Sequence, residues 1–135
     1  MTIAYSTLIR NAQMQAVADE INGGGGAGLL RMYDGSRPSS GGTVTNLLAE
    51  LTFSATMEAS VSGGVLTADT ITAEDSAPYA GTNNATWFRV VDAAGTFCID
   101  GDIAASGADL NMTSVAITQG EGVEVTSFAL TAGNA

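Results

Sequence analysis

The sequence between residues 29 and 54 follows the pattern of a strand, a tight turn, a loop and a second strand. An apolar run from Leu29 ends at Asp34-Gly35, a pair typical of turns, and Arg37-Pro38 lies in the loop that follows. The segment 46–54 then alternates, with Leu47, Ala49, Leu51 and Phe53 on one face. Alternation with a period of two predicts β-structure for this part of the chain.

Strands and turns are also predicted for the rest of the chain. The pattern predicts a hairpin over 61–72 interrupted by Gly63-Gly64, a loop over 73–85, strands over 85–91 and 96–100 joined by a turn, and strands over 109–117 and 123–131. Strands at this spacing, with turns between them and no helices among them, are typical of an antiparallel sandwich or barrel. We therefore expect a mainly β fold, an antiparallel β-sandwich or barrel with one N-terminal α-helix.

The helix is predicted at the N-terminus. Ser6 is suited to cap it, and an apolar stripe at helical spacing follows, made of Tyr5, Leu8, Ile9, Ala12 and Ala16. Asn22 and four consecutive glycines end it. We expect a helix over 1–22, a flexible Gly-rich joint over 23–28 and a β-sandwich domain over 29–135. The stripe is expected to pack on the helix's own sheet, with contact to a neighbouring subunit as the alternative.

The composition narrows the function. The 135 residues carry 14 acidic side chains, four arginines, no lysine and no histidine, for a net charge of −10. Such a surface repels nucleic acid, so no nucleic-acid partner is expected. The acidity is explained by solubility and repulsion between monomers, or by an outward or partner-facing position in an assembly. No signal peptide or run of about 20 apolar residues is present, so synthesis in a cytoplasm and no membrane partner are expected.

The sequence lacks several residue types that commonly act in catalysis. Without histidine or lysine the commonest general base and amine nucleophile are missing, and Gly23–Gly28 lacks the lysine of a phosphate-binding loop. We expect no enzymatic activity, no catalytic residues and no cofactor. Cys98 is expected to be a small buried apolar residue. Oxygen ligands for Ca²⁺ exist at Asp100, Asp102 and Asp109, but a solvated turn explains them as well, so no metal site is predicted.

Some residues are candidates for contacts. Arg31 and Arg89 lie inside apolar strands, so we expect them on an exposed or partner-facing side with a carboxylate opposite. Arg37 in its loop, Tyr79 in the Pro-containing loop, and Leu8 and Ile9 on the helix are the candidate interface residues. The remaining aromatic residues in strands, Tyr33, Trp87 and Phe88, are expected in the core.

The segment Leu29–Gly35, with its order of leucine, arginine, apolar residue, tyrosine, aspartate and glycine, resembles a signature of a family of small tailed-bacteriophage virion proteins. The resemblance covers residues 6–54 best and continues through Trp87-Phe88-Arg89 and 106–111. It implies a structural protein encoded among head and tail genes. The expected role is a capsid decoration or cement protein on the capsid surface, with the major capsid protein and further copies of itself, in a trimer, as partners.

Two other functions are compatible with the sequence. The chain could instead be a tail-tube, tail-completion or fibre-associated subunit, which uses residues 61–72 or 73–85 as an exposed hairpin. A protein of another class, a soluble carbohydrate- or Ca²⁺-binding β-sandwich module, is the third hypothesis.

Overall fold

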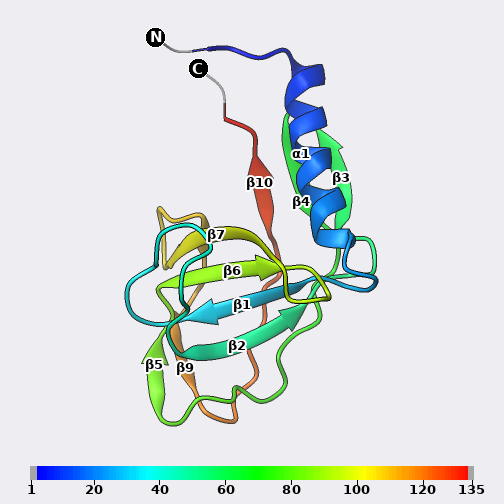
Figure 1. Ribbon diagram of the computed structural model, residues 1–135. Coiled ribbons are helices and arrows are strands. Elements are labelled where there is room, and N and C mark those ends of the chain that lie inside the picture. The colour runs from blue at the N-terminus through cyan, green and yellow to red at the C-terminus, as the bar shows by residue number, and fades with distance from the viewer. Residues whose placement is uncertain (1–2, 134–135) are drawn as a thin grey trace.

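A computed structural model describes residues 3–133 of the chain (Figure 1). One helix and ten strands follow in the order α1 (Thr7–Asn22), β1 (Leu29–Tyr33), β2 (Leu47–Thr52), β3 (Glu58–Ser62), β4 (Val65–Ala68), β5 (Thr82–Asn84), β6 (Trp87–Val91), β7 (Phe97–Ala104), β8 (Leu110–Asn111), β9 (Ala116–Thr118) and β10 (Ala129–Thr131). The chain is mainly β with one N-terminal helix, and its curled sheets have the character of a β-sandwich or barrel, as the sequence predicts.

The largest sheet has the strand order β2-β1-β6-β7-β8. Its pairs are antiparallel except for β7 and β8, which run parallel. The core forms between the inner face of this sheet and side chains from the loops and later strands. Its residues include Leu30, Met32, Leu51, Phe53, Phe88, Val90, Ile103, Val125 and Phe128. The rings of Phe53 and Phe88 both meet Phe128 edge to face, with centroids 5.6 Å apart. Apolar burial of this kind supplies most of the driving force for folding.

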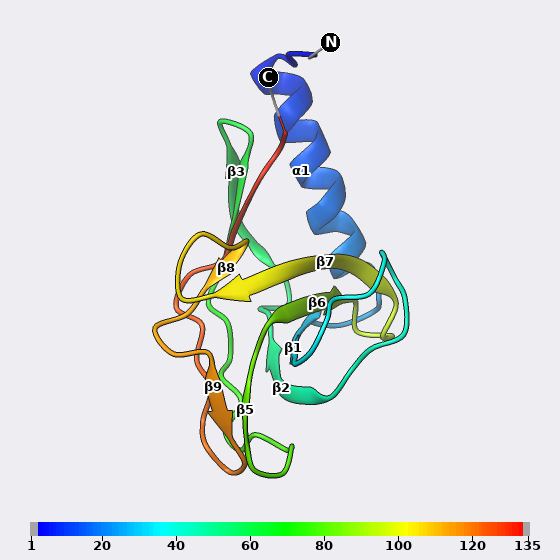
Figure 2. The same cartoon turned by 90° about the vertical axis from the view of Figure 1, so that its left-hand side faces the viewer.

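The helix and the three-stranded sheet β10-β4-β3 project from one end of this sheet (Figures 1 and 2). The β3–β4 hairpin turns at Gly63-Gly64, whose φ angles of +63° and +77° suit the tight turn of a two-residue hairpin. The pair β5 and β9 lies at the opposite end of the molecule, together with the loop 73–81 that leads into β5 (Figure 1). The fold therefore has two distant ends on either side of the five-stranded sheet.

The helix packs on its own domain, but not through the predicted stripe. Ala18 and Ile21 are fully buried, and Met14 and Val17 pack partly against the core. The stripe from Tyr5 to Ala16 lies on the exposed side of the helix. The expected packing face was therefore wrong. The strands β3, β4 and β7 contact α1 on another side. The helix meets them through a second apolar stripe with spacing i, i+3, i+4 and i+7, which runs from Met14 to Ile21.

The Gly-rich segment 23–28 follows the helix directly and is packed closely against the body. A Cβ at Gly24 would lie 2.6 Å from the backbone N of Ala93, and one at Gly28 would lie 2.5 Å from Ile21 Cγ2. These two glycines allow the backbone to pass close to the turn after β6 and to the end of the helix, which a side chain would prevent. The segment thus has a packing role that its composition alone does not indicate.

The structure also differs from the predicted strands. The expected loop 73–85 contains β5, the expected strand 109–117 is divided into β8 and β9, and most of the expected strand 123–131 is irregular, with β10 formed at its end. In β2 and β7 the register shifts, with Leu48 and Cys98 as the extra residues. The bulge explains why Leu48 is buried although strict alternation places it on the polar face.

Candidate interaction surface

Hydrogen bonds hold α1 rigidly against the β3–β4 hairpin. The Ser6 side chain caps the helix by accepting from the Ile9 N–H at 3.3 Å. Asn11 Oδ1 accepts from the Gly64 N–H at 2.7 Å, and Asn22 Oδ1 accepts from the Met57 N–H at 2.8 Å. The amides of the helix thus bond both the turn and the base of the hairpin, so helix and hairpin form one unit.

Glu58, at the start of β3, joins this contact from the hairpin side. Its carboxylate accepts from Asn22 Nδ2 at 2.8 Å and from Gln15 Nε2 at 3.1 Å. Burial disfavours the ionised carboxylate, but hydrogen bonds from Asn22, from its own backbone N–H and from Gln15 outweigh it and lower the pKa of Glu58 below its ordinary value. The carboxylate therefore stays ionised and keeps the helix docked at neutral pH.

The projecting end of the molecule contains no acidic residue. We call this end the apex and define it as residues 3–18, 59–68 and 129–133, which include most of α1, the β3–β4 turn and β10 (Figure 1). All 14 acidic side chains lie elsewhere in the chain. Glu58 and Asp69 mark the boundary at the base of the hairpin, where the Asp69 N–H donates to the Met57 carbonyl. We call the rest of the described chain the body. Apex and body thus differ in charge as well as in position.

The apex also exposes apolar side chains. Four of the six large apolar side chains that are exposed within residues 3–133 lie there: Ile3, Tyr5, Leu8 and Ile9. Leu8 is 80% exposed and Ile9 is 47% exposed. Scattered single apolar residues are normal on a protein surface, but several exposed apolar residues in a region without acidic side chains are typical of a contact site. The predicted interface residues Leu8 and Ile9 therefore lie together on an accessible surface.

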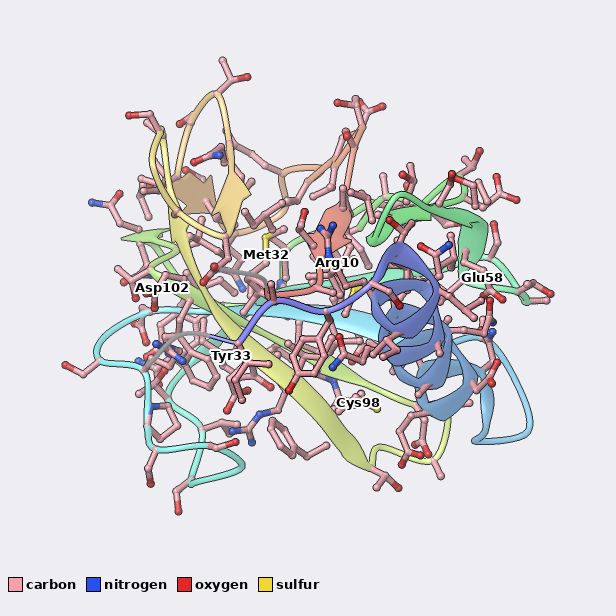
Figure 3. The ribbon with its side chains drawn as sticks, turned by 90° about the horizontal axis from the view of Figure 1, so that it is seen from above. Arg10, Met32, Tyr33, Glu58, Cys98 and Asp102 are labelled. Atoms are coloured by element: carbon pink, nitrogen blue, oxygen red, sulfur yellow. The ribbon has the colours of Figure 1, made fainter. Side chains whose placement is uncertain are left out.

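Arg10 is the one charged residue of the apex. Its guanidinium lies against the β3–β4 turn, where a Cβ at Gly64 would approach Arg10 Cζ to 2.6 Å. Its Nε is buried and has no hydrogen-bond partner within the described residues. Figure 3 views the molecule from the apex and shows Arg10 and Glu58 beside the helix, with Asp102 well away from it. Sequence reasoning did not single out Arg10, and the Gly-Gly turn that makes room for it was the available signal.

The outer face of the five-stranded sheet carries a row of four charged side chains. In the strand register, Glu50 on β2 is opposite Arg31 on β1, Arg31 is opposite Arg89 on β6, and Arg89 is opposite Asp100 on β7. Arg31 Nε lies 2.7 Å from Glu50 Oε2, and Arg89 Nε lies 2.7 Å from Asp100 Oδ1. The two arginines at the centre are each neutralised by a carboxylate on the outer side.

Each predicted carboxylate partner is therefore present, but the predicted exposure of Arg89 was wrong. Arg89 and Asp100 are buried, and Arg89 lies between the rings of Trp87 and Phe97, 5.4 and 5.1 Å from their centroids. The hydrogen bonds to Asp100 raise the pKa of Arg89, so the pair stays ionised. The low exposure of both side chains gives this ion pair a structural role.

Aromatic stacking and a loop cover this row. Tyr33 stacks on Trp87 at 4.4 Å between centroids, and both are buried, as predicted for core aromatics. Trp87 Nε1 donates to the Asp34 carbonyl at 3.0 Å, and the Gly41 N–H donates to Asp100 Oδ2 at 3.2 Å. The loop 34–46 thus closes over the sheet beside β7 (Figure 2). Burial raises the pKa of Tyr33.

The other candidate residues do not converge. Arg37, in the loop 34–46, forms an ion pair with Asp102 on β7, with Nε 2.8 Å from Oδ1. Tyr79 is exposed in the loop 73–81, at the end of the molecule opposite the apex. The structure therefore separates Arg37 and Tyr79 from Leu8 and Ile9, instead of bringing all four onto one surface.

The three weak metal candidates each have another partner. Asp100 binds Arg89, Asp102 binds Arg37, and Asp109 Oδ2 accepts from the Asp102 N–H at 2.9 Å. Within residues 3–133, no group of three or more acidic or cysteine side chains is placed to hold a metal ion.

Cys98 is half-buried at the bulge of β7, not fully buried as expected. Burial raises the pKa of its thiol. Neutral thiols are weak nucleophiles, so this position has the chemistry of a packing residue.

Comparison with protein-family models, with curated proteins and with solved structures gives no match to this chain. In the part of the chain that the structure describes, the helix does not have the length and apolar character needed to cross a membrane.

Proposed function

We propose that this chain is a non-enzymatic structural subunit of a tailed-phage virion, and that it serves as a capsid decoration or cement protein on the shell of the major capsid protein. The observation that carries the proposal is the separation between an apolar, acid-free apex and a body that holds all 14 acidic residues. An assembly subunit needs a contact surface that is free of repulsion and a second surface that stays in solvent.

The internal ion pairs support the same function. Arg31, Arg37 and Arg89 are each paired with a carboxylate of the same chain, so an acidic ligand would have to displace that carboxylate. We therefore expect a partner to bind this chain through contact area and shape complementarity and not through these arginines. Decoration works in this manner, because many copies on a symmetric shell convert modest contacts into stable attachment.

The tail is the alternative position in the virion. The strand β3 forms one edge of the sheet β10-β4-β3, and an edge strand offers unpaired backbone groups to a neighbouring subunit. This observation fits a ring-forming subunit of a tail, so tails belong in the test beside heads.

The test is co-sedimentation of the purified protein with heads that lack it and, separately, with tails of the same virus. Saturable binding to heads at a fixed ratio to the major capsid subunit is the expected result. Binding to tails alone moves the protein to the tail. Binding to neither overturns a virion role and leaves a soluble carbohydrate- or Ca²⁺-binding module to be tested with glycans and Ca²⁺.

A variant with a charge in the apex sharpens the test. Leu8→Asp places a carboxylate at an 80% exposed position and leaves the core untouched. Gln13→Asp is the matched control, because it adds the same charge to the same helix at an exposed position outside the apolar stripe. We expect Leu8→Asp to lower the amount of protein bound to heads and Gln13→Asp to bind as the wild type does.

A further inference from the structure

The exposed side of α1 is opposite the side that packs on the rest of the chain. With 3.6 residues per turn, the packed residues Met14, Val17, Ala18 and Ile21 lie on one side of the helix. Leu8, Ile9, Ala12 and Ala16 lie on the other side, and all four are exposed. We call these four residues the outer stripe. It extends along the helix from its first turn into its third.

We propose that the outer stripe binds the outer stripe of a second copy of this chain, with the two helices antiparallel and a two-fold axis close to Ala12. This inference rests on the proposed structural function and names a second copy of the chain, instead of the major capsid protein, as the partner of the outer stripe. Pairing about a two-fold axis uses the same surface on both copies, so the surface must be complementary to itself.

The side-chain sizes in the outer stripe meet this condition. The large residues Leu8 and Ile9 lie at one end, and the small residues Ala12 and Ala16 follow one and two turns later. An antiparallel pair places Leu8 of one copy against Ala16 of the other, so that large side chains fill the space above small ones. A parallel pair would set large residues against large ones and leave a gap between the alanines.

The charges on the helix favour the same orientation. Asp19 lies on the exposed side near the C-terminal end, and the first turn of the helix contains no acidic residue. An antiparallel pair brings Asp19 of one copy to the N-terminal turn of the other, where the helix dipole attracts a carboxylate. A parallel pair would bring the two Asp19 carboxylates together.

The charge of the body explains why a second copy meets the apex and not another face. Each copy carries a net charge of −10, and the excess of carboxylates lies outside the apex. Contact between two bodies opposes like charges at close range, whereas contact between two apices does not. The apex is therefore the surface through which identical copies associate with least repulsion.

The size of the contact sets its expected strength. A helix of 16 residues is about 24 Å long. One pair of such helices buries less than the roughly 800 Å² per partner of a standard interface. We therefore expect a weak dimer in free solution, with a Kd of about 10–100 µM, which becomes stable when copies are held close together on a shell.

Cysteine cross-linking tests the geometry directly. In a Cys98→Ala background, Ala12→Cys places two thiols beside the two-fold axis, where the Cα atoms fall within the roughly 7 Å that a disulfide needs. Gln13→Cys is the control, because it is exposed on the same helix outside the outer stripe. We expect mild oxidation to give a disulfide-linked dimer of Ala12→Cys at least tenfold faster than of Gln13→Cys. Circular dichroism verifies that each variant is folded.

Orientation is read from a mixed experiment. Leu8→Cys and Ala16→Cys variants, one of them carrying a size tag, are oxidised together. An antiparallel pair gives mainly the mixed dimer of Leu8→Cys with Ala16→Cys. A parallel pair gives mainly dimers of Leu8→Cys with itself and of Ala16→Cys with itself, and this result overturns the proposal. A trimer in light scattering overturns it as well.

Light scattering of the wild type at high concentration completes the test. A dimer that Leu8→Asp converts to monomer supports the proposal. A strict monomer, with equal cross-linking of Ala12→Cys and Gln13→Cys, overturns it and leaves a different protein as the partner of the apex. Head binding is measured separately, so a chain that dimerises but binds no head retains this inference and loses the proposed function.

Discussion

The guanidinium of Arg89 and the carboxylate of Asp100 form two parallel hydrogen bonds, with Nε to Oδ1 at 2.7 Å and Nη2 to Oδ2 at 2.8 Å. Both side chains are buried, and the rings of Trp87 and Phe97 lie beside the guanidinium. The geometry leaves neither charge exposed to water. Loss of one partner would therefore leave the other buried and unpaired, which is costly.

Replacement of Asp100 tests this pair. Asp100→Asn keeps the volume and removes the negative charge, so we expect the free energy of unfolding to fall by about 3–5 kcal/mol. Asp102→Asn is the control, because Asp102 pairs with Arg37 at an exposed site, where an ion pair contributes about 0–1 kcal/mol. Urea denaturation measures both. Equal losses in the two variants would contradict the structural role of Arg89 and Asp100.

The packed face of α1 is tested by a pair of alanine substitutions. Ile21→Ala removes a fully buried side chain and is expected to cost about 2–5 kcal/mol of unfolding free energy. Leu8→Ala changes an 80% exposed side chain and is expected to stay within about 0.5 kcal/mol of the wild type. Thermal and chemical denaturation of the monomer at low concentration provide the values. A large loss from Leu8→Ala would show that the helix packs through its outer stripe.

A third prediction concerns the close approach of β6 and β7. A Cβ at Gly101 would lie 2.4 Å from Phe88 Cζ, which is too close for any side chain to fit without movement. Gly101→Ala should therefore force the ring to move and lower the free energy of unfolding by about 1–3 kcal/mol. Gly122→Ala, where the nearest atom would be at 3.5 Å, serves as the control and should change stability little. The prediction fails if both variants unfold at the same urea concentration.

The carboxylate of Glu58 predicts a pH dependence of helix docking. Its pKa is lower in the folded chain than the ordinary value of 4.5, so its stabilising effect is complete above about pH 4.5 and disappears as the pH falls through the folded value. The effect should not exceed about 1 kcal/mol, because the side chain is only partly buried. Unfolding free energies of the wild type and Glu58→Gln, measured from pH 7 downward, should differ at neutral pH and converge in acid. A constant difference over this range would exclude the mechanism.

The sequence indicated the elements whose signals are local. The turn at Asp34-Gly35, the alternating strands β2 and β6 and the hairpin turn at Gly63-Gly64 all formed as predicted, because each depends on residues close together in the chain. The carboxylates opposite Arg31 and Arg89 were also expected, since an arginine in an apolar strand needs a partner.

Long-range packing was not accessible from the same pattern. The helix carries two apolar stripes on opposite sides, and periodicity identifies both without stating which one meets the sheet. That choice depends on where the chain leaves the helix, at Asn22, relative to β1 and the hairpin. The bulges at Leu48 and Cys98 likewise depend on the partner strands. The acid-free apex became recognisable only when three distant segments were brought together.

The row of Glu50, Arg31, Arg89 and Asp100 also restricts how the sheet can assemble. The strands β1 and β6 are far apart in the sequence, so their alignment is not set by a short turn. A slip of one residue would turn Arg31 into the apolar core, and a slip of two would separate it from Arg89 and place it opposite Trp87 or Val91. A one-residue slip is therefore opposed by the cost of moving charge into the apolar core, whereas the two ion pairs favour the observed alignments of β1 with β2 and of β6 with β7.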